Sequence, residues 1–395
     1  MSGVILFFIV LFLWLGCTGT ILARNVRRRS NVELSGIGED CFECRCEIVN
    51  EPTEAGAVAA FVVGMRGRVF APTAMHDTDV QILIADVSDN SSEPKPVLCT
   101  VGQWQLDDSP VFCFRAYNGK IPHRSSVLAN WILITTIRSD VLRYPRKGSR
   151  KLKFITSLIS RSTGEELACA STIIDYENNE AGYIDKKENS ELAEKLSVQL
   201  AAMVLAAGGQ NKEQAAQAVN AWIDKKIEAL GGNKNRADIS SRLMGYFADA
   251  TESSQPDMQD NIEVLCHELA GCSSILQRYE ALKLSLGVVG ATGYICHEQT
   301  ALLSSMVELL GVDGAKFRAM AQKILCGYAR EVADADFLLG VTSDMSADAI
   351  RERLSDEYQK WNCRVTHPDK FIRDQAERML SLIAESRSKY VEQAC

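Results

Sequence analysis

The sequence predicts a multidomain protein with an N-terminal transmembrane helix, an all-β sandwich-like domain, an all-α helical bundle and a C-terminal α-helical domain. Three observations support this fold class. The chain begins with a long apolar segment, continues with short runs rich in β-branched and aromatic residues, and then changes to apolar residues at helical spacing. A length of 395 residues is enough for several domains of ordinary size.

The predicted transmembrane helix covers residues 4–23, which carry no charge. This run is long enough to cross the hydrocarbon core of a membrane. Arginines cluster at residues 24–29, directly after the apolar run, and no Lys or Arg precedes it, so the positive-inside rule predicts an N-terminus outside the cytoplasm. We therefore expect a single-pass protein of the inner (plasma) membrane, with a juxtamembrane linker at residues 24–56 and the bulk of the chain in the cytoplasm. Lipidation of Cys17 is the alternative, but the basic start of such a signal is missing.

Cysteines are frequent, with thirteen in the chain. Cys41, Cys44 and Cys46 form a C-x-x-C-x-C pattern that could offer three thiolates to zinc. A structural zinc site needs a fourth ligand, no second ligand pair follows, and the nearest histidine is His76. The three cysteines are therefore weak metal candidates, and the favoured interpretation is a reduced cluster at the start of a strand.

The predicted β domain spans residues 57–180. Its strand-like runs are separated by turn clusters such as "SDNSSEPKP", "YNGK", "RKGSR" and "RSTGE". Their number and spacing favour a small antiparallel sandwich or barrel. No pattern in this segment is typical of catalysis, and a charged linker is expected at residues 177–191.

The predicted helical domain spans residues 190–330. Its segment "LLSSMVELLGVDGAKF" (302–317), together with His297-Glu298, resembles the second half-repeat of the TerB family of tellurite-resistance-type helical bundles. The resemblance implies two half-repeats, each with a turn that often carries Asp-Gly.

The acids of those turns are absent from this sequence. Gly208-Gly209 and Thr292-Gly293 stand where the family often has Asp-Gly. Carboxylate oxygens are the usual ligands of hard cations, so we expect no cation site at these turns.

The last predicted domain spans residues 335–393 and contains two amphipathic helices joined by a loop. Asp344 or Ser346 is the expected N-cap of the first helix. Apolar residues at i, i+4, i+8 and i+11 form its expected buried stripe, namely Ile350, Leu354, Tyr358 and Trp361. The corresponding stripe of the second helix consists of Ile372, Ala376, Met379, Leu380, Ile383 and Tyr390.

The loop between these helices contains His-Pro-Asp within "VTHPDKF" (365–371). Together with "LLGV" before it and "AERMLSLIAESRSKYV" after it, the tripeptide resembles the J domain of DnaJ-type co-chaperones. The resemblance implies that the tripeptide and a basic helix dock on a DnaK-type chaperone and stimulate its ATPase. The partner-binding residues carried over onto this sequence are His367, Pro368, Asp369, Lys370, Lys360 and Arg364.

Two features depart from the J-domain pattern. Ile350 and His367 are 17 positions apart, which is about five more than in ordinary J domains. Either the helix before the loop is more than a turn longer, or the loop absorbs "CRVT" (363–366). The basic residues of that helix are also diluted by Glu352 and its acidic neighbours.

The predicted function is that of a membrane-anchored co-chaperone of the DnaJ and DjlA type, with a J domain that stimulates a DnaK-type ATPase. The alternative is a non-catalytic membrane scaffold with a divergent J-like interaction domain. We expect neither enzymatic activity nor a cofactor, because the sequence contains no Walker loop, no G-x-S-x-G and no H-E-x-x-H. A net charge of −8 argues against nucleic acid as a partner.

Overall fold

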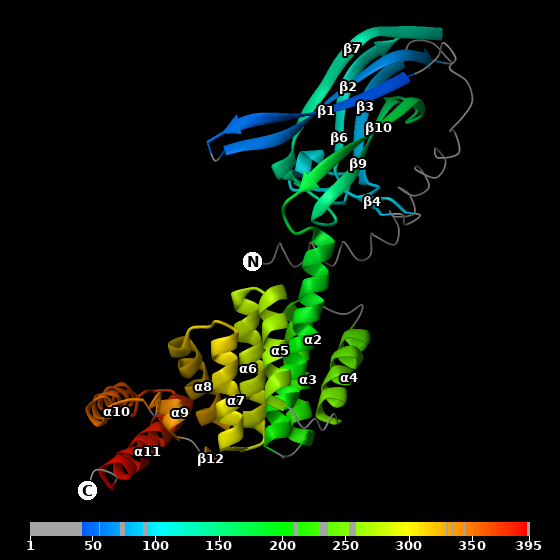
Figure 1. Cartoon of the computed structure of the whole chain (residues 1–395). Coiled ribbons are helices and arrows are strands. Elements are labelled where there is room, and N and C mark those ends of the chain that lie inside the picture. Colours follow the sequence, from blue (N-terminus) through cyan, green and yellow to red (C-terminus); the bar gives the residue numbers. More distant parts are fainter. Residues whose placement is uncertain are drawn as a thin grey trace. The chain divides into compact units, whose positions relative to one another are not determined.

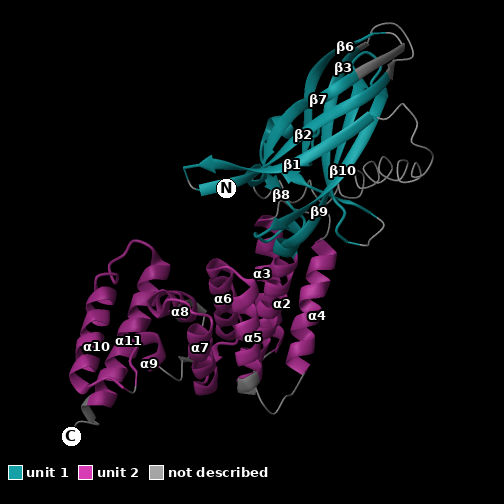
Figure 2. Ribbon diagram, turned by 45° about the horizontal axis from the view of Figure 1, so that its top comes forward, with its two compact units in different colours: residues 1–187 teal, residues 188–395 magenta. Residues whose placement is uncertain are grey.

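The structure is a computed structural model of the chain, and it describes residues 42–392 with short gaps. The gaps are residues 55, 72–75, 90–92, 123, 209–211, 230–235, 253–257, 329–330, 333–334 and 343. The chain divides into two compact units, unit 1 (1–187) and unit 2 (188–395), which are drawn in teal and magenta in Figure 2.

Unit 1 is β-rich, and its described strands pair in antiparallel fashion (Figure 1). One sheet has three strands in the order β1 (Phe42–Thr53), β2 (Gly56–Ala71) and β7 (Arg124–Arg138). A second sheet has the order β10 (Glu166–Asn178), β9 (Gly148–Ser160), β3 (His76–Asp86) and β4 (Lys95–Pro96), with β6 (Cys113–Ile121) also paired to β3. A short pair joins β5 (Leu98–Cys99) to β8 (Leu142–Arg143), and 3₁₀ turns lie at Gly102–Trp104 and Ser139–Val141.

The main core of unit 1 draws side chains from both large sheets. The ring of Phe61 in β2 lies 5.3 Å from that of Phe154 in β9 and 5.2 Å from that of Tyr176 in β10. The first contact is tilted and the second is edge-to-face, and aromatic pairs favour such arrangements over face-to-face stacking. Alternate residues of β3, including Ile82 and Ile84, point into the same core, as the two-residue period of a strand requires.

The strand-like runs of the sequence are confirmed as strands, but two boundaries differ from expectation. The predicted linker at residues 24–56 contains β1, which pairs with β2 along its whole length. The predicted turn "YNGK" lies inside β6, where Gly119 has a φ of +112° and the pairing with β3 shifts by one residue. Glycine and asparagine there form a β-bulge, which uses the same residue types as a turn.

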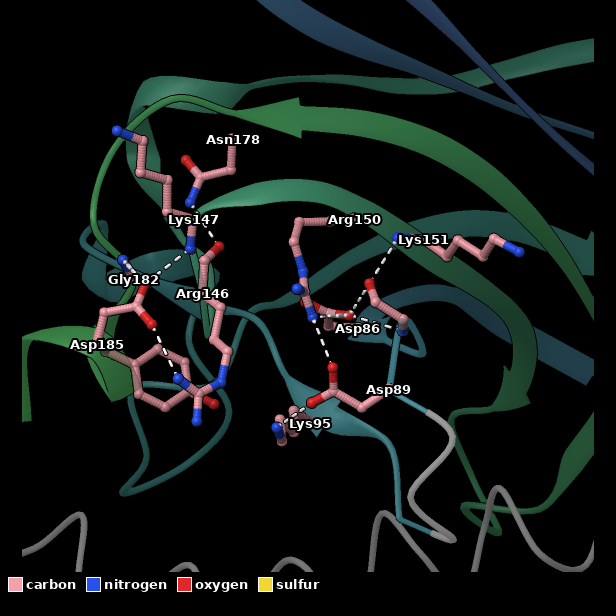
Figure 3. A network of polar contacts seen from close by, with 12 residues as sticks. Asp86, Asp89, Lys95, Arg146, Lys147, Arg150, Lys151, Asn178, Gly182 and Asp185 are labelled. Carbon is pink, nitrogen blue, oxygen red and sulfur yellow. Dashed lines mark hydrogen bonds and ion pairs between the residues drawn. The ribbon is translucent and has the colours of Figure 1, made fainter. Parts of the chain in front are cut away.

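A buried ion pair connects β3 with β9 in unit 1. The guanidinium of Arg150 donates to both carboxylate oxygens of Asp86, at 2.8 and 3.2 Å (Figure 3). Asp86 also accepts from the amide and hydroxyl of Ser88, and Arg150 reaches Asp89, which pairs with Lys95. Buried charges need such a complete set of partners, because an unpaired one costs several kcal/mol.

A second polar cluster in unit 1 fixes the first turn of α2 (Tyr183–Ala207). The Asp185 carboxylate accepts from the amides of Gly182 and Lys147, at 2.9 and 2.7 Å, and from the Arg146 guanidinium at 3.0 Å (Figure 3). A side chain on Gly182 could not fit, because its Cβ would lie 2.1 Å from the carbonyl oxygen of Pro145. The predicted linker at residues 177–191 is therefore the end of β10 followed by the anchored start of α2.

Unit 2 is helical (Figure 1). After α2 come α3 (Lys212–Ala229), α4 (Arg236–Glu252), α5 (Met258–Cys272), α6 (Ile275–Ala291), α7 (His297–Leu309), α8 (Gly314–Tyr328), α9 (Ala335–Leu339), α10 (Ala347–Asn362) and α11 (Lys370–Glu392). A short parallel pair, β11 (Tyr294–Ile295) and β12 (Glu331–Val332), lies among the helices.

The helices of unit 2 surround two apolar cores. The larger core runs without interruption from Leu200 in α2 through Leu325 in α8 to Leu354 in α10 and Ile383 in α11. The smaller core lies among α2, α3, α4 and α6 and includes Ile223 and Phe247. The last three helices therefore share a core with the helices before them.

The predicted fold class is wrong as a layout of four separate parts. Instead of an all-β sandwich, unit 1 has a three-stranded sheet, a five-stranded sheet and a separate two-stranded pair. Instead of an all-α bundle followed by an independent C-terminal domain, unit 2 includes a parallel strand pair, and its larger core is shared between the bundle helices and the last three helices. The reason is that periodicity identifies strands and helices, whereas their partners depend on contacts far apart in the sequence.

The predicted transmembrane helix at residues 4–23 lies outside the described residues. Among the helices that the structure does describe, none combines the length and the apolar character needed to cross a membrane.

We predict that the anchor at Asp185 weakens in acid. Burial alone would raise the pKa of Asp185, but the Gly182 and Lys147 amides and the Arg146 guanidinium outweigh burial and hold that pKa below its ordinary value. The ionised Asp185 carboxylate therefore stabilises the folded state fully at pH values above the ordinary pKa of an aspartate, about 3.9. This stabilisation is lost as the pH falls through the lower pKa that Asp185 has in the folded state. The protection of the Lys147 amide against hydrogen exchange, measured from pH 7 to pH 3, should fall in the acid range.

Asp185→Asn should reduce that protection at pH 7 and remove its acid dependence. The matched control is Asp140→Asn, which changes an exposed carboxylate paired with Arg138 and should leave Lys147 unaffected. Equal protection of Lys147 in wild type and Asp185→Asn at every pH would contradict the prediction.

Candidate functional site

The hairpin formed by α10 and α11 carries the predicted partner-binding residues. Ser346 is the N-cap of α10, since its hydroxyl accepts from the Ala349 amide at 3.3 Å. The buried residues of α10 are Ile350, Leu354, Glu357 and Trp361. Tyr358 was expected in this stripe but is 40% exposed, with the Arg387 guanidinium over its ring at 5.0 Å.

The second helix, α11, packs largely as its periodicity predicts, except that Ile372 is half-buried and does not belong to the larger core. Ala376, Met379 and Ile383 are buried in the larger core, and Leu380 and Tyr390 pack against it. Near its C-terminal end, the Tyr390 hydroxyl donates to Asp336 in α9 at 2.8 Å. The hairpin and α9 thus form one packed group.

The loop absorbs the extra residues, and α10 ends at Asn362. Successive turn hydrogen bonds follow, including those from the Arg364 amide to the Trp361 carbonyl at 3.0 Å and from the His367 amide to the Arg364 carbonyl at 3.1 Å. The segment "CRVT" is therefore a wound turn that connects α10 to the tripeptide.

The tripeptide is held by its own backbone contacts. Nδ1 of His367 accepts from the Asp369 amide at 3.1 Å, which leaves Nε2 of a neutral ring as the donor. The Asp369 carboxylate accepts from the Phe371 amide at 2.8 Å and so caps the N-terminus of α11. Arg373 donates to the carbonyls of His367 and Pro368, at 2.7 and 2.8 Å. Pro368 and Asp369 are exposed, and His367 is half-buried.

The three basic candidate residues have different surroundings. Lys370 is exposed at the start of α11, and Arg364 is exposed with its guanidinium 4.7 Å from the centre of the Trp361 ring. Lys360 instead points towards α8, where its ammonium donates to Gln322 at 2.9 Å and to Glu357 at 3.1 and 3.2 Å. The structure therefore brings Arg364 and Lys370 to the tripeptide loop, whereas Lys360 is held in a separate network.

Glu357 is the centre of that network, and only 3% of the residue is exposed. One carboxylate oxygen accepts from Arg353 at 3.1 Å and from Lys360. The other accepts from Trp361 Nε1 at 3.0 Å, Gln322 Nε2 at 3.2 Å and Lys360. The carboxylate is fully satisfied and links α10 to α8.

Glu357 and Gln322 were not among the predicted site residues. The spacing of Ile350, Leu354 and Trp361 does indicate that Glu357 lies on the buried face of α10. Positions i, i+4, i+7 and i+11 form a narrower stripe on a helix than positions i, i+4, i+8 and i+11. The position i+7 is Glu357, and its charge hid it from a search for apolar residues. Gln322 has no comparable signal in the sequence.

The cysteine candidates do not form a metal site in the described part of the chain. Cys41 lies outside the described residues, while Cys44 and Cys46 lie in β1. Burial raises the pKa of Cys44 and raises that of Cys46 to about 12, so both thiols stay protonated near neutral pH. Among the described residues no group of three potential ligands is close enough to hold a metal ion.

Searches of the whole chain against protein-family models, curated proteins and solved structures found no match in any of the three. The resemblances to J domains and to the TerB family therefore stay predictions from the motifs of the sequence.

We predict that Glu357→Ala destabilises the contact between α8 and α10 by about 2 kcal/mol. The substitution leaves Trp361 Nε1 without its acceptor and removes the carboxylate that pairs with Lys360, which keeps only Gln322. Partial exposure of Lys360 keeps the value below that of a fully buried pair. Amide hydrogen exchange in α10 and α8 should increase. Glu352→Ala, an exposed position of the same helix, is the control and should change little. Equal exchange in the two variants would contradict the central position of Glu357.

Proposed function

We propose that the α10–α11 hairpin is a J-like module that docks on a DnaK-type chaperone and stimulates its ATP hydrolysis. The observation that carries this proposal is the geometry of the tripeptide: the hairpin presents Pro368 and Asp369 to solvent on a loop that several hydrogen bonds fix. A fixed loop loses little conformational entropy when it binds a partner, which favours docking.

Each residue of the loop has a role in this proposal. His367 offers Nε2 as a donor, and Asp369 offers the carboxylate oxygen that does not cap α11 as an acceptor for an arginine of the partner. Arg364 and Lys370 supply positive charge for an acidic chaperone surface. The hairpin catalyses no bond change itself. The apolar segment at residues 4–23 keeps its predicted role as a membrane anchor.

A non-catalytic scaffold is the second candidate, and the position of Lys360 favours it. Lys360 was expected to face the chaperone, yet its ammonium is bound to Glu357 and Gln322 within unit 2. Without this charge the docking surface has fewer basic residues than a J domain usually presents. In this case the hairpin binds a partner without stimulating ATP hydrolysis.

We expect His367→Gln to abolish stimulation of the ATPase, because a flexible amide replaces the rigid ring that accepts from the Asp369 amide and holds its other nitrogen toward the partner. Single-turnover ATP hydrolysis by a DnaK-type chaperone, with and without the full chain, measures this effect. The matched control is His267→Gln, which changes an exposed histidine of unit 2 on α5. The co-chaperone proposal fails if wild type and His367→Gln stimulate equally or not at all, and binding without stimulation would favour the scaffold.

We also expect Arg373→Ala to weaken stimulation roughly tenfold, as the loss of a charge-assisted hydrogen bond predicts. Arg373 is a positioning residue, because its guanidinium holds the carbonyls of His367 and Pro368. Hydrogen exchange of the loop should increase in Arg373→Ala, and Arg373→Lys should restore part of the stimulation because it retains a donor. If Arg373→Ala stimulates the ATPase fully although hydrogen exchange of its loop is faster, then a fixed loop is not needed for stimulation.

A further inference from the structure

A polar pocket of about 320 Å³ lies between α8 and α10 of unit 2. It is separate from the tripeptide loop, and its volume is at the lower end of the range for small-molecule sites. Three basic side chains line it, namely Arg318 from α8 and Arg353 and Lys360 from α10. The other lining residues are Ala315, Ala319, Gln322, Asp356 and Glu357.

Two of the three cations already have a carboxylate partner. Arg353 and Lys360 both contact Glu357, and the five hydrogen bonds to this carboxylate leave no room for another cation. Asp356 also lines the pocket, but it is exposed and makes no ion pair with these cations among the described residues. Glu357 therefore cannot neutralise Arg318.

Arg318 is the cation of this pocket that makes no direct hydrogen bond to a carboxylate of the described residues, although its charge helps to lower the pKa of the exposed Asp313. Its Nε is buried, and among the described residues it has no hydrogen-bond acceptor. The side chain lies over Gly340, which has a φ of +70° and no Cβ; a Cβ there would be 2.8 Å from Cδ of Arg318 and 3.2 Å from Nη2 of Arg353. The side chains of Arg318 and Arg353 thus approach each other beside Gly340, and there is space for both because glycine has no Cβ.

Like charges at such close approach repel, and an anion between them removes the repulsion. A guanidinium presents forked N–H donors that match the oxygens of a phosphate group, and a phosphate can accept from several donors at once. Arg318 supplies a guanidinium whose Nε has no acceptor among the described residues, and Arg353 keeps N–H donors beyond those that Glu357 and the Leu339 carbonyl occupy. The Lys360 ammonium already makes three hydrogen bonds, so it adds positive charge and no free donor.

We propose that this pocket binds a phosphate group, either as inorganic phosphate or as part of a small phosphomonoester, with Arg318 as the principal ligand. The bound group would connect α8 to α10 directly. The proposal goes beyond chaperone docking and does not depend on it, because no residue of the tripeptide loop lines the pocket.

The test is titration calorimetry of the full chain with inorganic phosphate and with glycerol 3-phosphate, at constant ionic strength. Saturable binding should be seen for wild type, and the two ligands distinguish free phosphate from a phosphomonoester. Acetate and chloride serve as control anions and should bind more weakly. Arg318→Gln should weaken phosphate binding about tenfold or more, as expected for the loss of a charge-assisted contact.

Arg351→Gln is the matched control, because it removes one positive charge from α10 at an exposed position paired with Asp348, outside the pocket. It should retain wild-type affinity. Arg318→Lys, which keeps the charge but loses the fork, should show intermediate affinity and guards against misfolding of the Gln variant, with circular dichroism as the check. No binding to wild type, equal binding to Arg318→Gln, or equal loss in Arg351→Gln would overturn the proposal.

Discussion

Glu357 places a negative charge inside unit 2, and the C-terminal helices are arranged so that this charge is satisfied. Its carboxylate collects donors from α10 itself and from Gln322 in α8. Gln322 in turn donates to the Leu338 carbonyl in α9 at 2.8 Å, and Gln375 of α11 donates to the Gln322 carbonyl at 3.1 Å. One buried acid thus connects four helices, because each group that neutralises it brings its own element into contact.

Unit 1 solves the same physical problem at Asp86. This carboxylate is buried between β3 and β9, and Arg150 satisfies it with two hydrogen bonds, while Ser88 completes the set. Apolar packing supplies most of the stabilisation of a fold but has little directionality. A buried ion pair instead requires one particular register of its two strands, since a shift by a single residue would turn one partner to the opposite face.

The network around Glu357 also bears on the two proposals. It holds Lys360 away from the tripeptide loop, so docking on a chaperone would depend on Arg364, Lys370 and the tripeptide. It also leaves Arg318 beside α10 with a buried Nε that has no acceptor among the described residues, which is the basis of the phosphate proposal. Both consequences follow from the charge balance at one helix contact: a single carboxylate with five hydrogen bonds cannot serve three basic side chains.

Several local features of this protein were determined by the sequence alone. The runs of β-branched residues became strands, and Ser346 and the apolar spacing after it set the start of α10 and the buried face of α11. These features depend on hydrogen bonds and periodicity within a few residues, and so can be inferred from neighbouring residues. Only the tertiary structure decided that the expected linker contains β1, which pairs with β2. The same holds for the core that the last helices share with α8 and for the contact of Lys360 with Gln322. Each of these depends on a partner distant in the chain, such as Gln322 for Lys360, and local patterns carry no information about which distant residue will be near.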